Sequence, residues 1–366
     1  MPKAIASMVS AVFPAFPAKV FLRDALSGYE ALELMQRGRH IARVLRRHLP
    51  EPYPKAVDIL MASAAQPSGR DPTSSMAGFL FMPHCFFVAE YGLDDFEPSM
   101  RAQYLLTQRF TAEFSIRPFL IQHPEATLAR LKQWARDPSA QVRRLVSEGS
   151  RPRLPWASRL PAFQADPRPV LELLELLKDD PSLYVRRSVA NNLNDIGKDH
   201  PKLLADTAQR WLVGASPERS WVVRHALRFA VKNGDVAALG VLGFGKAARV
   251  QIHGVSFDPP YPAVGGAVRI AFDLHNPTRY PQDVLVDLRV LYVKANGSSA
   301  AKVFKLKSIA LGSLDTVHLR KKLSLVEMTT RKHYAGCHAV EVLVNGQVMR
   351  LGSFDLLPAA QAEVRS

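Results

Sequence analysis

Two stretches in the middle of the chain are near-copies of each other: Asp137-Pro138-Ser139-Ala140-Gln141-Val142-Arg143-Arg144 and Asp180-Pro181-Ser182-Leu183-Tyr184-Val185-Arg186-Arg187. Val142 and Val185 lie about 43 residues apart, and a third copy, Trp221-Val222-Val223-Arg224, follows at a similar interval. Paired-helix repeats of the HEAT type recur every ~40–47 residues. The spacing therefore predicts a HEAT-like α-solenoid with a strongly cationic concave face, for which nucleic acid is the natural partner.

Hydrophobic residues recur at helical intervals from about Phe21 to Leu242. Loops with Asp-Pro, Ser-Pro or Gly separate the segments, and short loops of this kind join antiparallel helices in a solenoid. Around the repeats we predict helices over residues 124–135, 140–149, 168–178, 182–196, 201–212 and 218–232.

The period changes from helical to alternating after Gly243-Phe244-Gly245-Lys246. Val268, Ile270, Phe272 and Leu274 alternate with polar residues, and a similar run ends at Asn345-Gly346, a pair typical of type I′ hairpins. About seven short strands over about 110 residues predict an immunoglobulin-like β-sandwich. We expect a helical domain at 1–245, a linker at 246–252, the sandwich at 253–358 and a flexible tail at 359–366, a multidomain, mainly α chain.

The composition favours a polyanionic partner and excludes several classes of protein. The 366 residues include 48 Lys and Arg against 33 Asp and Glu, a formal net charge of +15. Two cysteines cannot build a disulfide framework or a zinc cluster. No apolar run approaches the ~20 residues of a membrane span. Pro14 and Pro17 interrupt the apolar start, so we expect no signal peptide and a reduced, cytoplasmic protein that associates with the nucleoid through DNA.

Helical spacing places basic side chains in one stripe on each repeat, and carboxylates lie among them in the first two. Arg144 and Glu148 are four residues apart, and so share a face of their helix. The other two stripes contain Arg187, Asn191 and Asp195, and Arg224, Arg228 and Lys232. A solvated face with ordinary i, i+4 ion pairs is the plainer interpretation of any one stripe. Three stacked stripes favour a surface that binds the phosphates of DNA. An acidic residue on such a surface would weaken phosphate binding, so we expect the acids to have another function.

Two further segments surround these acids with basic and aromatic residues. Glu148 precedes a loop with Arg151 and Arg153 that ends at Trp156, an indole suited either to core packing or to stacking on a base or sugar. Glu113 lies in an apolar segment with Arg117 one turn on, where a local ion pair is the structural alternative. The sequence has no Gly-rich phosphate loop, metal-ligand cluster or nucleophile elbow, so we expect no cofactor and no metal.

Three of these runs resemble the DNA alkylation repair glycosylases of the HEAT-like class, and among them the AlkC branch, some members of which carry a C-terminal immunoglobulin-like domain. The runs are Glu113-Phe114-Ser115-Ile116-Arg117-Pro118-Phe119-Leu120, Val142-Arg143-Arg144-Leu145 through Arg153-Leu154-Pro155-Trp156, and Ser188-Val189-Ala190-Asn191-Asn192-Leu193-Asn194-Asp195. The resemblance implies a monofunctional enzyme that excises cationic N3-alkylated bases, 3-methyladenine and 3-methylcytosine, from duplex DNA without flipping the base.

On that basis we expect Glu148 and Glu113 to stabilise positive charge on the deoxyribose and to orient water, with Asp195 as a less certain third acid. Trp156 would pack against the sugar or the lesion backbone. A basic set would hold the phosphates of a DNA bound by a monomer: Arg143, Arg144, Arg151, Arg153, Arg186, Arg187, Arg224, Arg228 and Lys232, with Asn191 beside them. Two alternatives stay open, a non-catalytic HEAT protein that binds damaged or branched DNA and a protein-interaction scaffold.

Overall fold

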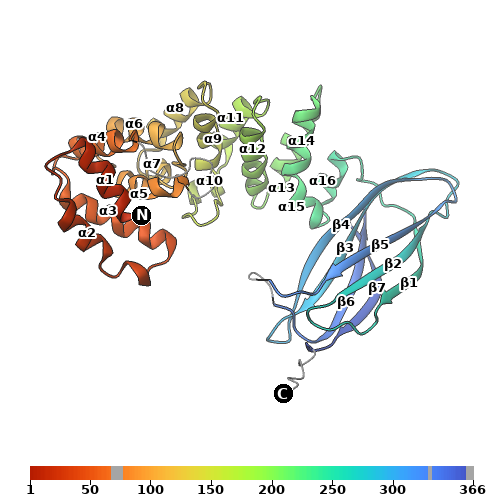
Figure 1. Ribbon diagram of the computed structural model, residues 1–366. Helices are drawn as coiled ribbons and strands as arrows, with labels where there is room; N and C mark the ends of the chain where they lie inside the picture. The colour runs from red at the N-terminus through yellow and green to blue at the C-terminus, as the bar shows by residue number, and fades with distance from the viewer. Residues whose placement is uncertain (67–76, 329–331, 360–366) are drawn as a thin grey trace, which may run out of the picture. The chain divides into compact units, whose positions relative to one another are not determined.

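A computed structural model of the chain describes residues 1–66, 77–328 and 332–359 (Figure 1). All but the first residue of the predicted tail lies outside these residues. The helices follow in chain order as α1 (Pro2–Val12), α2 (Ala18–Leu26), η1 (Tyr29–Ala31), α3 (Leu34–His48), α4 (Tyr53–Ala64), η2 (Ala77–Phe81), α5 (Met82–Tyr91), α6 (Phe96–Thr107), α7 (Ile116–Gln122), α8 (Pro124–Trp134), α9 (Ala140–Gly149), α10 (Pro161–Ala165), α11 (Arg168–Leu177), α12 (Leu183–Ile196), α13 (Pro201–Leu212), α14 (Pro217–Ala226), α15 (Arg228–Lys232) and α16 (Val236–Val241).

The repeated Asp-Pro-Ser motif begins the two central helices. Asp137 Oδ1 accepts a hydrogen bond of 2.8 Å from the Ser139 amide before α9, and Asp180 Oδ1 accepts the same bond from Ser182 before α12. Aspartate turns of this kind supply the hydrogen bonds that a helix start otherwise lacks. Ser139 also caps α9, because its hydroxyl accepts from the Val142 amide. The sequence repeat is thus a repeat of helix initiation.

Apolar residues of the repeats pack the central helices together. Five apolar residues of the two helices are fully buried: Val142 and Leu145 on α9, and Val185, Val189 and Leu193 on α12. Helix α12 packs on α9 on one side and on α14 on the other. The HEAT-like solenoid predicted from the period is confirmed.

One predicted helix is wrong as a single element. The segment 218–232 divides into α14 and α15 at Leu227, whose ψ of −8° departs from the helical value near −42°. Arg224 therefore lies on a different helix from Arg228 and Lys232, and the third basic stripe is interrupted.

The C-terminal strands form the predicted sandwich of two antiparallel sheets, ordered β1-β2-β5 and β4-β3-β6-β7 (Figure 1). They are β1 (Gln251–Asp258), β2 (Ala267–His275), β3 (Gln282–Val293), β4 (Ser299–Leu311), β5 (Thr316–Ser324), β6 (Gly336–Val344) and β7 (Gln347–Leu356). The alternating residues of β2 and β6 lie in one core. Asn345 and Gly346 join β6 to β7 with φ of 47° and 79°, the left-handed values of a type I′ turn.

The described residues divide into two compact units. The first contains Met1–His200 and Gly214–Ala226, and the second contains Pro201–Val213 and the described residues from Leu227 onward. Helices α13, α15 and α16 thus group with the sandwich. The predicted boundary after residue 245 follows the change of secondary structure and stays a prediction.

Candidate active site

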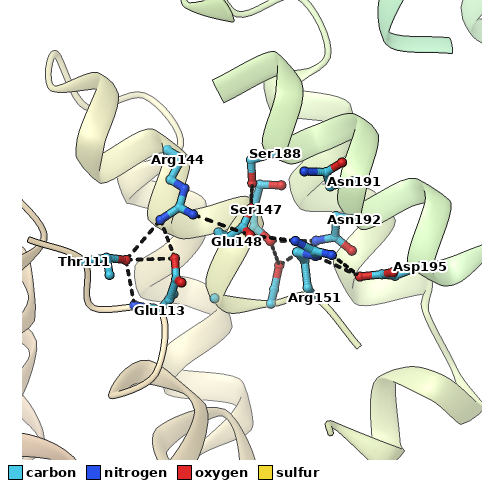
Figure 2. Close-up of polar contacts among 12 residues, drawn as sticks. Thr111, Glu113, Arg144, Ser147, Glu148, Arg151, Ser188, Asn191, Asn192 and Asp195 are labelled. Atoms are coloured by element: carbon cyan, nitrogen blue, oxygen red, sulfur yellow. Dashed lines mark hydrogen bonds and ion pairs between the residues drawn. The ribbon is translucent and has the colours of Figure 1, made fainter. Parts of the chain in front are cut away.

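The three predicted acids lie together in the first unit, each on a different helical layer (Figure 2). Glu113 lies in the turn before α7, Glu148 in the last turn of α9 and Asp195 in the last turn of α12. Two arginines from α9 and the residues after it, Arg144 and Arg151, lie between them. We call these five residues and Lys198 the carboxylate cluster.

Arg144 connects Glu113 to Glu148. Its Nη1 donates to Glu113 Oε2 and, over 3.0 Å, to the hydroxyl of Thr111, while its Nη2 lies 3.4 Å from Glu148 Oε1. Burial by itself would lower the pKa of Arg144, but the neighbouring Glu113 and Glu148 carboxylates outweigh burial and raise it. Arg144 therefore stays a fixed cation between two acids.

Glu148 stands at the centre of the cluster and is only 6% exposed. Its Oε1 accepts from Arg151 Nη1 over 2.7 Å, and its Oε2 accepts from the Ser188 hydroxyl over 2.6 Å. Buried charges need such partners, because an unpaired one costs several kcal/mol. The contacts fix both oxygens of this carboxylate in space.

Arg151 continues the alternation to Asp195. Its Nε and Nη2 lie 2.8 and 2.7 Å from Asp195 Oδ2, and Lys198 Nζ lies 2.8 Å from Oδ1. Asp195 is 1% exposed. Burial opposes the charge of Arg151, yet Glu148 and Asp195 together raise its pKa. The cluster thus holds three negative and three positive side chains in alternating order.

Arg117 fixes the loop that follows α9. It donates to the carbonyl oxygens of Ser158, Gly149 and Arg151 through four hydrogen bonds of 2.5–3.0 Å. The local ion pair with Glu113, which was the structural alternative for this segment, is not formed, and Glu113 pairs with Arg144 instead. Burial, with Arg151 adding to it, lowers the pKa of Arg117 to about 10.

This loop presents Trp156 to solvent. The indole residue is 84% exposed and its φ is +63°, a left-handed value that is unusual for a bulky residue. Core packing, one of the two interpretations of this residue, is wrong. Strained backbone of this kind is concentrated at binding and catalytic sites.

A cavity of about 600 Å³ opens beside the cluster. Glu113, Glu148, Arg151 and Trp156 line it together with apolar side chains of the N-terminal helices. The apolar members include Leu34, Met35, Phe79, Met82, Phe110 and Phe114. Carboxylates and aromatic rings around one hollow form a surface suited to a cationic, partly apolar group.

Several residues of the predicted DNA-binding set make structural contacts. Arg143 forms a two-pronged ion pair with the buried Asp180, at 2.6 and 3.0 Å. Arg186 donates to the carbonyls of Asp180 and Pro181, both over 2.8 Å, and Arg153 pairs with Asp199. These contacts brace helix starts and loops rather than leave the guanidinium groups ready for phosphate.

Other members of that set lie at the surface. Arg187 and Arg224 in the first unit are exposed, as is Lys232 in the second, whereas Asn191 and Arg228 are half-buried. Within the described chain Arg187 makes no hydrogen bond or ion pair. Arg187 is therefore available to a ligand, as is Arg224, which likewise makes no hydrogen bond or ion pair within the described residues. Ser188 and Tyr184, which also contact the cluster, were missed because neither carries a charge.

Residues 1–66, 77–328 and 332–359 contain no group of three or more His, Cys, Asp or Glu side chains placed to hold a metal ion. Over the same residues, none of the helices combines the length and apolar character needed to cross a bilayer.

Comparison with known proteins gives the family. The chain is 43% identical to the alkylpurine DNA glycosylase AlkC of Pseudomonas fluorescens, solved bound to DNA containing an abasic site analog, with a TM-score of 0.89 and 97% of both chains covered. The chain belongs to the AlkC family. It is also 38% identical to the uncharacterized protein YhaZ of Bacillus subtilis (strain 168) over 341 residues, 93% of this chain and 92% of that one. The model of the C-terminal Ig-like domain of YhaZ matches residues 251–358, so this AlkC family member carries the sandwich as a family feature.

Proposed function

We propose that this protein is a monofunctional DNA glycosylase that hydrolyses the N-glycosidic bond of cationic N3-alkylated bases, 3-methyladenine and 3-methylcytosine, in duplex DNA. The observation that carries the proposal is the carboxylate cluster: Glu113 and Glu148 line one cavity with the exposed indole of Trp156, and the buried Asp195 lies next to them in the cluster. The 43% identity to a glycosylase bound to abasic DNA supports it.

The chemistry needs few groups, because the substrate base already bears a positive charge. When the C1′–N bond breaks, its electron pair neutralises the base, so the leaving group needs no acid. The sugar becomes oxocarbenium-like, and a water oxygen then bonds to C1′ and releases a proton. Glu113 and Glu148 would stabilise the sugar cation and orient that water, with Asp195 behind them.

The cluster suits that task since its acids are held before substrate arrives. Preorganised charges stabilise a transition state without reorganising at the moment of reaction. Trp156 would pack against the sugar or the backbone at the lesion, where an indole face adds ~0.5–2 kcal/mol of cation–π attraction. The base stays stacked in this proposal, since the acids would approach the sugar and not the base.

DNA would be held mainly by the exposed basic residues Arg187, Arg224 and Lys232, with Arg228 and Asn191 beside them. Arg144 and Arg151 would order the acids, while Arg143, Arg153 and Arg186 would keep the repeat helices in register. We assign these roles from the contacts that each side chain makes: exposed residues to DNA, and residues paired within the protein to structural support.

The test is release of free bases from alkylated DNA. Purified protein is incubated with methylated duplex DNA and with a duplex containing one 3-methylcytosine, and the released bases are measured by mass spectrometry. We expect 3-methyladenine and 3-methylcytosine in excess of a heat-inactivated control. Tight binding without release would instead indicate a non-catalytic HEAT protein for damaged DNA, and absence of both would favour the scaffold.

A further inference from the structure

Tyr184 lies against the carboxylate cluster although it carries no charge and makes no ion pair. It begins the first turn of α12 and is 48% exposed. The guanidinium carbon of Arg144 lies 5.2 Å from the centre of its ring. The guanidinium therefore lies over one face of the tyrosine ring, and about half of the tyrosine is exposed to solvent.

The edges of the same guanidinium are already occupied. Arg144 contacts Thr111, Glu113 and Glu148 through its two terminal nitrogens, and its side chain is largely buried. A guanidinium that contacts two carboxylates and also lies over an aromatic ring has little freedom to rotate. The tyrosine ring and the two carboxylates thus together surround the guanidinium of Arg144.

A polyanionic substrate would compete for this arginine. Arginine forms two-pronged contacts with phosphate as readily as with carboxylate. If Arg144 turned toward a phosphate, Glu113 and Glu148 would lose the group that holds them side by side. Contact with the ring opposes this exchange, because the guanidinium would have to leave the ring in order to turn its N–H groups toward a phosphate.

The other copies of the repeat lack this arrangement. Gln141 stands at the equivalent position of α9, where its side chain accepts a hydrogen bond from Ser139. Trp221 stands there in α14 and stacks on His225, with 5.0 Å between ring centres. Of the three equivalent residues, Gln141, Tyr184 and Trp221, Tyr184 is the one whose ring contacts an arginine of the carboxylate cluster.

We propose that Tyr184 is a positioning residue for base excision, which keeps Arg144 between Glu113 and Glu148 while DNA is bound. The inference rests on the proposed glycosylase function. It assigns the role to the aromatic ring and not to the hydroxyl, and it places the effect on the chemical step and not on DNA affinity.

The experiment compares Tyr184→Phe and Tyr184→Leu in single-turnover excision of 3-methylcytosine from a defined duplex, with DNA affinity measured separately on an abasic-analog duplex. Gln141→Leu is the matched control, because it introduces leucine at the equivalent position of the preceding repeat. We expect the Phe and Gln141 variants to stay within about twofold of the parent. The Leu variant should lose roughly 2- to 30-fold in rate, the equivalent of ~0.5–2 kcal/mol, at unchanged affinity.

A second pair of variants tests whether the effect passes through Arg144. In an Arg144→Gln background, Tyr184→Leu should cause no further loss of rate. A loss in the Phe variant equal to that in the Leu variant, weaker DNA binding at an unchanged rate, or additive losses in the double variant would each overturn the inference. A parent protein that releases no base refutes the proposed function itself, whereas an active parent matched by Tyr184→Leu refutes only the role of the ring.

Discussion

Replacing Glu148 by glutamine tests the centre of the proposed mechanism. The change keeps the shape of the side chain and its place between Arg151 and Ser188, but removes the negative charge. A unit charge about 4 Å from a developing cation is worth roughly 4 kcal/mol at an effective dielectric constant of ~20. Arg144 and Arg151 already neutralise part of that charge. We therefore expect the excision rate to fall by roughly 10²- to 10³-fold.

The same substitution should have small effects on binding and folding. Removing a negative charge near DNA cannot weaken phosphate contacts, so the Kd for an abasic-analog duplex should stay within about threefold. A charge-assisted hydrogen bond becomes a neutral one, which costs about 1–2 kcal/mol of stability. In a unit of this size, that lowers Tm by roughly 2–8 °C.

The assay is single-turnover release of 3-methylcytosine or 3-methyladenine, with thermal unfolding measured in parallel. Asp180→Asn is the matched control, because it removes a buried, arginine-paired carboxylate from the same repeats. It should lower Tm and leave excision within about threefold of the parent at temperatures below unfolding. If Glu148→Gln also excises within threefold of the parent, Glu148 has no part in stabilising the sugar cation.

Three other substitutions address binding, pH dependence and the loop. Arg187→Ala should weaken DNA binding and reduce the slope of log Kd against log salt by about 0.9, measured by titration at several salt concentrations; an unchanged slope would remove Arg187 from the phosphate-binding set. Burial lowers the pKa of His84 from 6.5 to about 4, so the unfolded chain binds a proton that the folded chain excludes. The free energy of unfolding should therefore keep its full value above pH 6.5 and fall by up to about 3 kcal/mol as the pH is lowered toward 4. Denaturant unfolding at several pH values measures this. If the His84→Gln variant shows the same full decline, His84 is not its cause. Arg117→Lys cannot make all four hydrogen bonds to these carbonyls, and should lower stability by about 3 kcal/mol and speed trypsin cleavage after Arg153. Unchanged cleavage would show that the loop keeps its structure without Arg117.

Periodic features of the sequence predicted the architecture well. The repeated Asp-Pro-Ser motif located α9 and α12, and the alternating residues before Asn345-Gly346 located β6 and its turn. Both signals are local, since a helix start and a hairpin depend on neighbouring residues. The division at Leu227 had no such signal, because neither Gly nor Pro marks it.

Side-chain partners were harder to predict, because they come from other repeats. Asp180 was recognised only within the repeated motif, yet it also forms an ion pair with Arg143 of α9, in the preceding repeat. Spacing offered Glu113 as a local alternative partner for Arg117, while the observed partners are carbonyls more than 30 residues away. One signal was present: an arginine between Ile116 and Phe119, both fully buried, must find buried acceptors.

Under the proposed function, the left-handed backbone at Trp156 sets stability and activity in opposition. Glycine or asparagine occupies that conformation at lower cost than a bulky residue. A library of variants selected only for resistance to heat should therefore replace the indole early, and it would enrich well-folded proteins in which an exposed ring near the acids is gone. Selection for survival of an alkylating agent should retain it. Retention of Trp156 would then show that a selection acted on activity, and its loss would show that the selection acted on stability.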